Sequence, residues 1–155
     1  MKTSEKGKKF LVEQEGLRLK VYLDTAGLPT IGVGHLIRPE DNLTLGDYIT
    51  DKQAMEFLDK DLEEAEDAIT NWVDVDLNQN QFDALVSFTF NLGVNAFKKS
   101  TLLKELNLEH YVMAASEFLK WNKVLNPKTG KKEISPAILS RRQREKALFE
   151  TPIVA

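Results

Sequence analysis

Two carboxylic acids near the start of the chain, Glu15 and Asp24, stand in surroundings that suit acid–base chemistry. Glu15 precedes Gly16 at the predicted end of a helix, where the partial negative charge of the last carbonyl groups disfavours an ionised carboxylate. Asp24 begins the turn-forming run Asp-Thr-Ala-Gly, a polar setting in which nothing favours its protonation. Two carboxyl groups in different environments can divide the roles of proton donor and base, which hydrolysis of a glycosidic bond requires.

Thr30 is a third candidate, because its hydroxyl group could hold a water molecule beside Asp24. These residues also have a purely structural interpretation, since a Glu at a helix end and an Asp in a turn are common features of any protein. The residue types alone therefore favour the structural interpretation, and the chemical one needs further support.

The composition excludes several kinds of site. The chain has 155 residues, which suits one domain or two small lobes that share a core. It contains no cysteine, which excludes disulfides, thiolate nucleophiles and thiolate metal ligands. Since His35 and His110 are its only histidines, a histidine-rich metal site is excluded too. We therefore expect no metal and no cofactor.

Charge is distributed unevenly along the chain. The formal net charge is −3, which argues against a nucleic-acid partner. Residues 40–76 carry 13 acidic and 2 basic side chains, whereas residues 111–155 carry 4 acidic and 9 basic ones. This pattern fits either two solvated faces of opposite sign or a basic surface that meets a polyanion such as an anionic cell envelope.

No membrane-directed segment is recognisable in the sequence. It contains no run of the roughly 18 apolar residues that a membrane-spanning helix needs. Residues 1–9 are polar and basic, and no apolar stretch long enough for a signal peptide follows them. We expect neither a signal peptide nor a transmembrane segment, and no obligatory membrane binding.

The elements that must position the candidate residues follow from periodicity and capping signals. Alternation over 17–23 and the β-branched run 30–36 predict a small sheet within residues 17–36, after a short helix over 4–14. Thr50 and Gln53 form a capping box that begins a long helix over 51–72. The remaining predictions are a helix from the N-cap Asn78 to Gly93, helices near 101–107 and 110–122, a loop over 126–130, and a last helix from Ser135 or Pro136 to Phe149. The fold class is therefore α+β and mostly helical.

The motif around the carboxylates resembles the signature of phage-type lysozymes, glycoside hydrolase family 24, which includes lambdoid and T-even phage enzymes. That signature reads E-G-x-x-L…D…T-I-G-x-G-H, and here it runs from Glu15 through Asp24 and Thr30 to His35. The resemblance continues through residues 78–85, 91–93, 100–103 and 141–149, so it covers essentially the whole chain.

The resemblance implies a lysozyme-like fold and a bacteriolytic endolysin that cleaves the β-1,4 bond between N-acetylmuramic acid and N-acetylglucosamine. It assigns the role of general acid to Glu15, that of base or water-positioning carboxylate to Asp24, and a helper role to Thr30. The T-even member inverts the anomeric centre, and we expect inversion here, with the two carboxyl groups about 6.5–9.5 Å apart. The expected partner is bacterial peptidoglycan. We expect a monomer that stays in the host cytoplasm until another protein breaches the membrane.

A single lysozyme domain is expected over residues 1–155. Its N-terminal lobe should span about 15–60 and its connecting helix about 51–72. The C-terminal lobe should span about 73–155 and include the first helix, 4–14.

Several other residues have a structural and a functional interpretation. Asp61 falls on the apolar stripe of the long helix, where an inward-facing carboxylate should be paired, and the resemblance aligns it with an acid that pairs with His35. The resemblance also implies that an arginine, Arg141 or Arg142, approaches the catalytic Glu; otherwise both are solvated charges.

Leu36, Phe90, Asn91 and Ser100 match positions that line the sugar-binding cleft of the family. Phe90 could equally be a core residue. Trp72 and Trp121 stand at helical spacing, which favours core packing over a sugar platform. The lysine-rich segment 126–135 has no assigned role.

Two alternatives to an enzyme stay open. One is a lysozyme-fold protein that binds glycan without cleaving it or serves structurally in a virion, although Glu15, Asp24 and Thr30 are all present. The other is a membrane-active protein that uses the basic last helix, whose apolar content is modest.

Overall fold

The computed structural model describes residues 1–153 and divides into two compact units. We call Lys8–Glu63 the sheet unit, and Met1–Gly7 together with the chain from Glu64 onward the helical unit. Of the first helix, the residues up to Gly7 belong to the helical unit and the rest belongs to the sheet unit. Within the sheet unit, Lys8 Nζ lies 2.7 Å from Asp59 Oδ1, which links the first helix to the long helix that follows.

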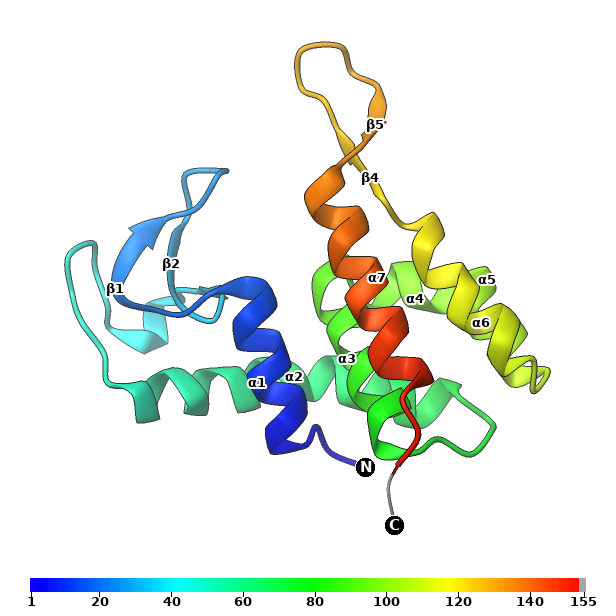
Figure 1. Cartoon of the computed structure of the whole chain (residues 1–155). Helices are drawn as coiled ribbons and strands as arrows, with labels where there is room; N and C mark the ends of the chain where they lie inside the picture. Colours follow the sequence, from blue (N-terminus) through cyan, green and yellow to red (C-terminus); the bar gives the residue numbers. More distant parts are fainter. Residues whose placement is uncertain (154–155) are drawn as a thin grey trace. The chain divides into compact units, whose positions relative to one another are not determined.

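Short strands and two helices make up the sheet unit (Figure 1). Its elements are most of α1 (Glu5–Glu15), β1 (Arg18–Leu23), β2 (Pro29–Gly32), β3 (His35–Leu36), the 3-10 turn η1 (Pro39–Asp41) and the first part of α2 (Asp51–Trp72). The strands form an antiparallel sheet in the order β1-β2-β3, as the sequence predicts. The predicted capping box is present at the start of α2, where Gln53 N–H donates to Thr50 Oγ1 at 3.1 Å and Thr50 N–H donates to Gln53 Oε1 at 2.8 Å.

One face of the sheet covers a small core. Val21, Ile31, Ile49 and Ala54 are buried there. The stretch before α2 pairs with β1, since Val21 N–H donates to Asp47 O at 2.9 Å and Ile49 N–H donates to Leu19 O at 2.8 Å. Side chains of the opposite parity, including Tyr22 and Thr30, which are cross-strand partners, therefore lie on the other face.

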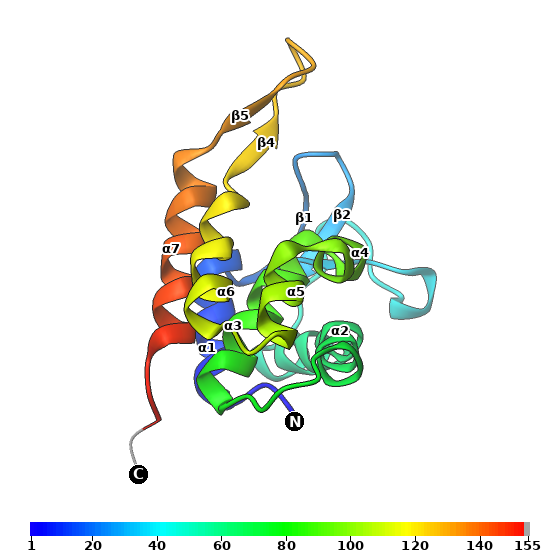
Figure 2. The ribbon, with the colours of Figure 1, turned by 90° about the vertical axis from the view of Figure 1, so that its right-hand side faces the viewer.

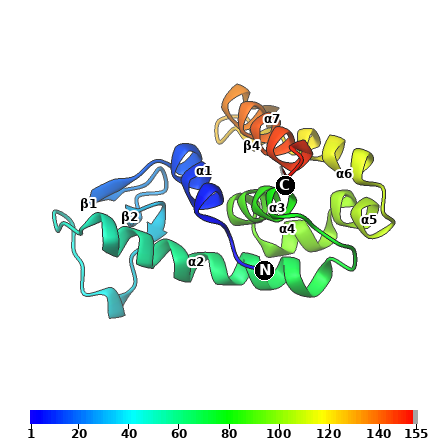
Figure 3. The same ribbon diagram turned by 60° about the horizontal axis from the view of Figure 1, so that its bottom comes forward.

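Helices alone form most of the helical unit. Its elements are the second part of α2, α3 (Gln79–Leu92), α4 (Val94–Lys99), α5 (Thr101–Asn107), α6 (Tyr111–Glu117), the 3-10 turn η2 (Phe118–Lys120), β4 (Lys123–Leu125), β5 (Lys132–Ile134) and α7 (Pro136–Glu150). Figure 3 shows α3 in the middle, with α7 on one side and α4 on the other. All residues of α3 from Phe82 to Thr89 are buried. Asn78 caps this helix through Gln81, as predicted.

The N-terminal residues are tied to the helical unit by buried polar contacts. Thr3 donates to Glu66 Oε2 from both its N–H and its hydroxyl group, each at 2.7 Å. Ser4 N–H donates to Asp83 Oδ1 at 3.0 Å. These contacts explain why the chain before Lys8 belongs to a different unit from the rest of α1.

Two features of the helical unit are absent from the sequence prediction. One is the short helix α4. The other is the antiparallel hairpin β4–β5, which projects from the helices in Figure 2 and encloses the predicted loop. Within the described residues, no helix is long and apolar enough to span a membrane.

Candidate active site

Glu15 is the last residue of α1 and stands beside a glycine of the sheet. Gly16 follows with φ +81°, and its N–H donates to Val12 O at 2.8 Å, which ends the helix in the predicted left-handed cap. A Cβ atom added to Gly34 would lie 3.7 Å from Glu15 Oε1, so the carboxyl group reaches the β2–β3 connection. Glu15 thus lies at the end of α1 with its carboxyl group close to the β2–β3 connection.

Asp24 is fixed by the turn between β1 and β2. Its Oδ1 accepts hydrogen bonds from Ala26 N–H at 2.9 Å and from Leu28 N–H at 2.8 Å. The turn also has two backbone bonds, Asp24 N–H to Leu28 O and Gly27 N–H to Asp24 O, both 2.9 Å. Among the described residues, no hydrogen bond engages Oδ2. One oxygen of Asp24 therefore builds the turn while the other is open to a water molecule or a substrate.

Thr30 lies diagonally across the strands from Asp24. Thr30 is the cross-strand partner of Tyr22, and Asp24 N–H donates to Leu28 O two residues nearer the turn. The side chains of Tyr22, Asp24, Leu28 and Thr30 therefore share one face of the sheet. Thr30 is 2% exposed, and its hydroxyl group donates to Leu28 O at 2.9 Å. Because that bond uses the only hydroxyl proton, the hydroxyl can act toward water only as an acceptor.

His35 lies between two carboxylates. Its Nδ1 is 2.7 Å from Asp61 Oδ2, the partner that the sequence suggests, and its Nε2 is 2.8 Å from Asp41 Oδ2, a contact that the sequence does not suggest. Phe57 stacks on the ring with a centroid distance of 4.2 Å. The three polar side chains are mostly buried. When both ring nitrogens carry protons, the imidazolium donates to both acids and ties β3 to η1 and α2.

The surroundings of Asp41 change the pKa of its carboxyl group. Burial on its own raises its pKa. The hydrogen bond from Arg38 N–H, the hydrogen bond and charge of His35, and the charge of Arg38 together outweigh burial and lower the pKa below its ordinary value. Asp41 also closes η1, since Arg38 N–H donates to Asp41 Oδ2 at 2.8 Å.

The other predicted sugar-binding residues occupy varied environments. Leu36 of the sheet unit is 49% exposed. In the helical unit, Phe90 is half-buried, and Asn91 Oδ1 accepts a hydrogen bond from Arg142. Ser100 is buried and caps α5, because its hydroxyl accepts from Leu103 N–H at 3.1 Å and donates to Phe97 O at 2.7 Å. The hydroxyl of Ser100 thus has a structural task in the folded protein.

A buried charge cluster at α7 includes two residues that sequence reasoning missed, Glu145 and Ser87. Glu145 is fully buried and lies 3.2 Å from Arg141 Nε and 3.2 Å from Arg142 Nη1. Ser87 Oγ donates to Glu145 Oε2 at 2.5 Å. Burial raises the pKa of Glu145, although both guanidinium groups and the Ser87 hydroxyl act in the opposite direction. The spacing of Arg141, Arg142 and Glu145 was the available signal, because i,i+3 and i,i+4 side chains meet on a helix.

The described residues contain no group of three or more His, Asp or Glu side chains placed to hold a metal ion.

Comparison with known proteins gives the family of the chain. A family model described as phage lysozyme matches residues 12–145. An endolysin of Salmonella phage P22 is 47% identical over 150 residues, which cover 96% of this chain and 98% of that protein. An endolysin of Acyrthosiphon pisum secondary endosymbiont phage 1 is 45% identical over 151 residues, which cover 97% and 99%. A crystal structure of a P22 lysozyme variant superposes with a TM-score of 0.86 at 44% identity, covering 97% of this chain and 99% of the other.

The chain belongs to the phage lysozyme family. It is a glycoside hydrolase of the endolysin type and degrades peptidoglycan. Its fold is the lysozyme-like α+β fold that the sequence predicts, with a small N-terminal antiparallel sheet and a mostly helical remainder. In this lysozyme the motif residues Glu15, Asp24 and Thr30 all belong to the sheet unit.

Proposed function

We propose that this lysozyme hydrolyses the β-1,4 bond between N-acetylmuramic acid and N-acetylglucosamine, with Glu15 as the proton donor to the leaving oxygen. The observation that supports this reaction most is that the two carboxylate oxygens of Asp24 have different surroundings. Its Oδ1 is occupied by two backbone N–H groups, and its Oδ2 stays open beside the sheet face. A carboxylate held in this way has one oxygen free to orient and deprotonate a water molecule.

Thr30 completes the proposed water site. Its hydroxyl proton is used by Leu28 O, so a lone pair of Oγ1 can accept a hydrogen bond from the same water that Asp24 deprotonates. A water molecule held by two acceptors presents its own lone pair to the anomeric carbon. This geometry of attack favours inversion of the anomeric centre, with Glu15 donating its proton on the other side of the bond.

The substrate contacts remain proposals of the same kind. Leu36 and Phe90 would provide apolar contacts to sugar rings, and Asn91 a polar one; Ser100 would contribute through its position rather than through a free hydroxyl group. The expected monomeric state is checked by light scattering, and the expected location in the host cytoplasm before lysis by cell fractionation.

Clearing of a peptidoglycan suspension tests the catalytic assignment. We expect Glu15→Gln and Asp24→Asn each to lower the rate by at least about 100-fold, the usual contribution of a general acid or base. Asn at position 24 keeps an oxygen for the two turn hydrogen bonds, so this variant removes charge and preserves the turn. Glu13→Gln is the matched control, because Glu13 is an exposed acid of the same helix. Equal clearing by Glu15→Gln and the wild type would end the enzymatic assignment.

Product analysis tests the reaction type. Hydrolysis adds one water to each cleaved bond, whereas a lytic transglycosylase leaves an anhydro sugar, and mass spectrometry separates the two. The anomer formed first, followed by NMR before mutarotation, tests inversion. Formation of the β-anomer as the first product would refute the proposed role of Asp24 as base.

A further inference from the structure

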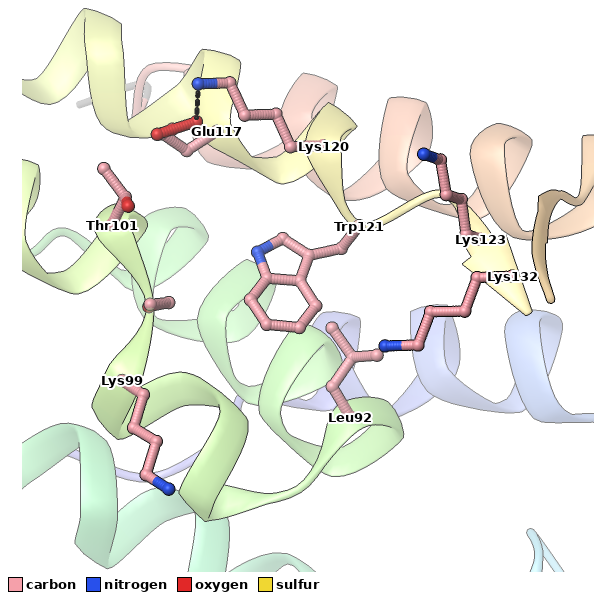
Figure 4. Close-up of a pocket in the computed structure, with 9 residues that line it drawn as sticks. Leu92, Lys99, Thr101, Glu117, Lys120, Trp121, Lys123 and Lys132 are labelled. Atoms are coloured by element: carbon pink, nitrogen blue, oxygen red, sulfur yellow. Dashed lines mark ion pairs between the residues drawn. The ribbon is translucent and has the colours of Figure 1, made fainter. Parts of the chain in front are cut away.

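A pocket of about 390 Å³ lies in the helical unit, and its lining includes Ser100, one of the predicted sugar-binding residues, but none of Glu15, Asp24 and Thr30. Figure 4 shows the indole of Trp121 at its centre, with the end of Lys132 near it, Lys120 turned toward Glu117, and Lys99 and Lys123 farther out on the rim. The lining residues are Leu92, Lys99, Ser100, Thr101, Glu117, Lys120, Trp121, Lys123 and Lys132. We call the four lysines the lysine collar.

The floor of the pocket is apolar and held in place. The ring of Trp121 packs edge-on against Phe88, with centroids 5.7 Å apart and planes at 90°. Phe88 in turn packs edge-on against Phe97 and Phe118, both buried. Trp121 is half-buried, so its fixed ring presents one apolar surface to the pocket beside Leu92. The sequence favours a core role for Trp121, and the structure gives it this additional surface.

The rim of the pocket has an excess of positive charge. Glu117, whose side chain is 8% exposed, pairs with Lys120 at 2.8 Å and so neutralises one lysine. Lys99, Lys123 and Lys132 have no ion-pair partner among residues 1–153. These three exposed ammonium groups come from α4, β4 and β5, so separate elements bring them to one pocket.

The hairpin separates its charges by face. Lys123 pairs with Ile134 and Leu125 pairs with Lys132, so both lysines lie on the same face of β4–β5. Glu133, the only acid of the hairpin, has the opposite parity and receives a hydrogen bond from Asn126 Nδ2 at 3.1 Å. The hairpin face that carries Lys123 and Lys132 is therefore basic and apolar, and the acid lies on the opposite face.

We propose that the lysine collar is a specificity subsite that reads the negative charge of the stem peptides attached to the glycan. This proposal rests on peptidoglycan being the substrate. The sugar backbone is neutral, and the free carboxylates of peptidoglycan are on its peptides. A short peptide combines carboxylates for the ammonium groups with aliphatic carbon for Trp121 and Leu92. Amidation of those carboxylates removes the charge and keeps the shape, so the subsite distinguishes the free from the amidated substrate.

Steady-state kinetics on soluble glycan strands tests this subsite. Two forms of the strands are compared: with free peptide carboxylates and with the same carboxylates amidated. In Lys123→Gln/Lys132→Gln, we expect KM on the free-carboxylate strands to rise about 3- to 10-fold with kcat unchanged, since each exposed ion pair contributes modestly. KM on the amidated strands should not change. Added salt at about 1 M should abolish the difference between the wild type and the variant.

Lys128→Gln/Lys131→Gln is the matched control, because it removes the same charge from the same hairpin outside the pocket. An equal rise in KM for the control variant, or a rise that persists on amidated strands, would overturn the proposal. Thermal unfolding of each variant separates misfolding from weakened binding. Competition by a phosphate wall polymer as strong as that by free-carboxylate peptide would assign the collar to phosphate instead.

Direct binding keeps this test independent of catalysis. Trp121 fluorescence is followed in a Trp72→Phe background, which leaves Trp121 as the only tryptophan. The probes are a stem tripeptide with free carboxylates and its fully amidated form, and we expect at least about 3-fold tighter binding of the former. If wild-type protein cleaves none of the strands yet shows this preference, the proposed catalytic function fails and the subsite stands. Equal binding of both peptides refutes the subsite whatever the activity.

Discussion

The histidine held between two acids yields a prediction about stability and its dependence on pH. In Asp41→Asn, one carboxylate that faces His35 Nε2 at 2.8 Å loses its charge but keeps an oxygen. The side chains of His35 and Asp41 are 6% and 11% exposed, so solvent screens their interaction only weakly. Exchanging a charge-assisted hydrogen bond, which contributes about 1.5–3 kcal/mol, for a neutral one, which contributes about 0.5–1.5 kcal/mol, costs about 1–2 kcal/mol. For a chain of this length, we expect the melting temperature at neutral pH to fall by about 2–8 °C.

The sign of the pH dependence follows from the lowered pKa of Asp41. A carboxyl group whose pKa is lower in the folded protein than in the unfolded chain stabilises the fold above the unfolded value, near 3.8. That contribution is lost as the pH falls through the folded pKa, where Asp41 becomes protonated. The difference in melting temperature between the wild type and Asp41→Asn should therefore be full at neutral pH and shrink at strongly acidic pH.

Thermal unfolding followed by circular dichroism at a series of pH values measures this difference. Glu40→Gln is the control, since Glu40 is exposed and adjacent but has no described contact with His35. A double-mutant cycle of Asp41→Asn with His35→Gln isolates the pair, and we expect a coupling of about 0.5–2 kcal/mol. An effect no larger than that of Glu40→Gln, or one that grows on acidification, would refute the argument.

Three further substitutions have outcomes that calorimetry or activity assays can check. Gly34→Ala places a side chain on a residue with φ +72°, which costs about 1–2 kcal/mol. Because the new Cβ atom lies beside Glu15, we expect lowered activity as well as lowered stability. Gly7→Ala would bring a Cβ atom 2.6 Å from Asp83 Cγ, so we expect a loss of about 1–3 kcal/mol. Glu145→Gln removes the buried charge that lies 3.2 Å from both Arg141 and Arg142, and a loss of about 3–5 kcal/mol should follow. An unchanged unfolding midpoint in any of the three would contradict its structural reason.

Much of the fold could be predicted because its signals are local. The long helix begins after the Thr50 capping box and ends at Trp72, as the sequence predicts, and Asn78 and Ser135 both cap the helices that follow them. Each cap uses a hydrogen bond between residues three apart, which a sequence displays directly. The helix α4 was missed because it is short and shares Gly93 and Ser100 with its neighbours as caps.

The β4–β5 hairpin was missed for a different reason. Its strands have three residues each and are largely exposed, so they lack the apolar alternation that marks a half-buried strand. The Asn126-to-Gly130 turn signals are visible in the sequence, but the strand pairing depends on backbone bonds such as Asn126 N–H to Lys131 O at 2.8 Å. A loop prediction was the outcome expected from composition alone.

The same contrast separates the two kinds of functional residue. In the sheet unit, Asp24 is positioned by hydrogen bonds to residues two and four places along the chain, and Glu15 by a glycine cap one residue on. Catalytic residues that are positioned by such local contacts can be recognised as a short sequence motif. In the helical unit, Glu145 meets Ser87 across 58 positions, and the lysine collar joins side chains up to 33 positions apart. Short motifs cannot record such contacts, so residues that tune specificity in this unit can change without altering the motif that carries out the reaction.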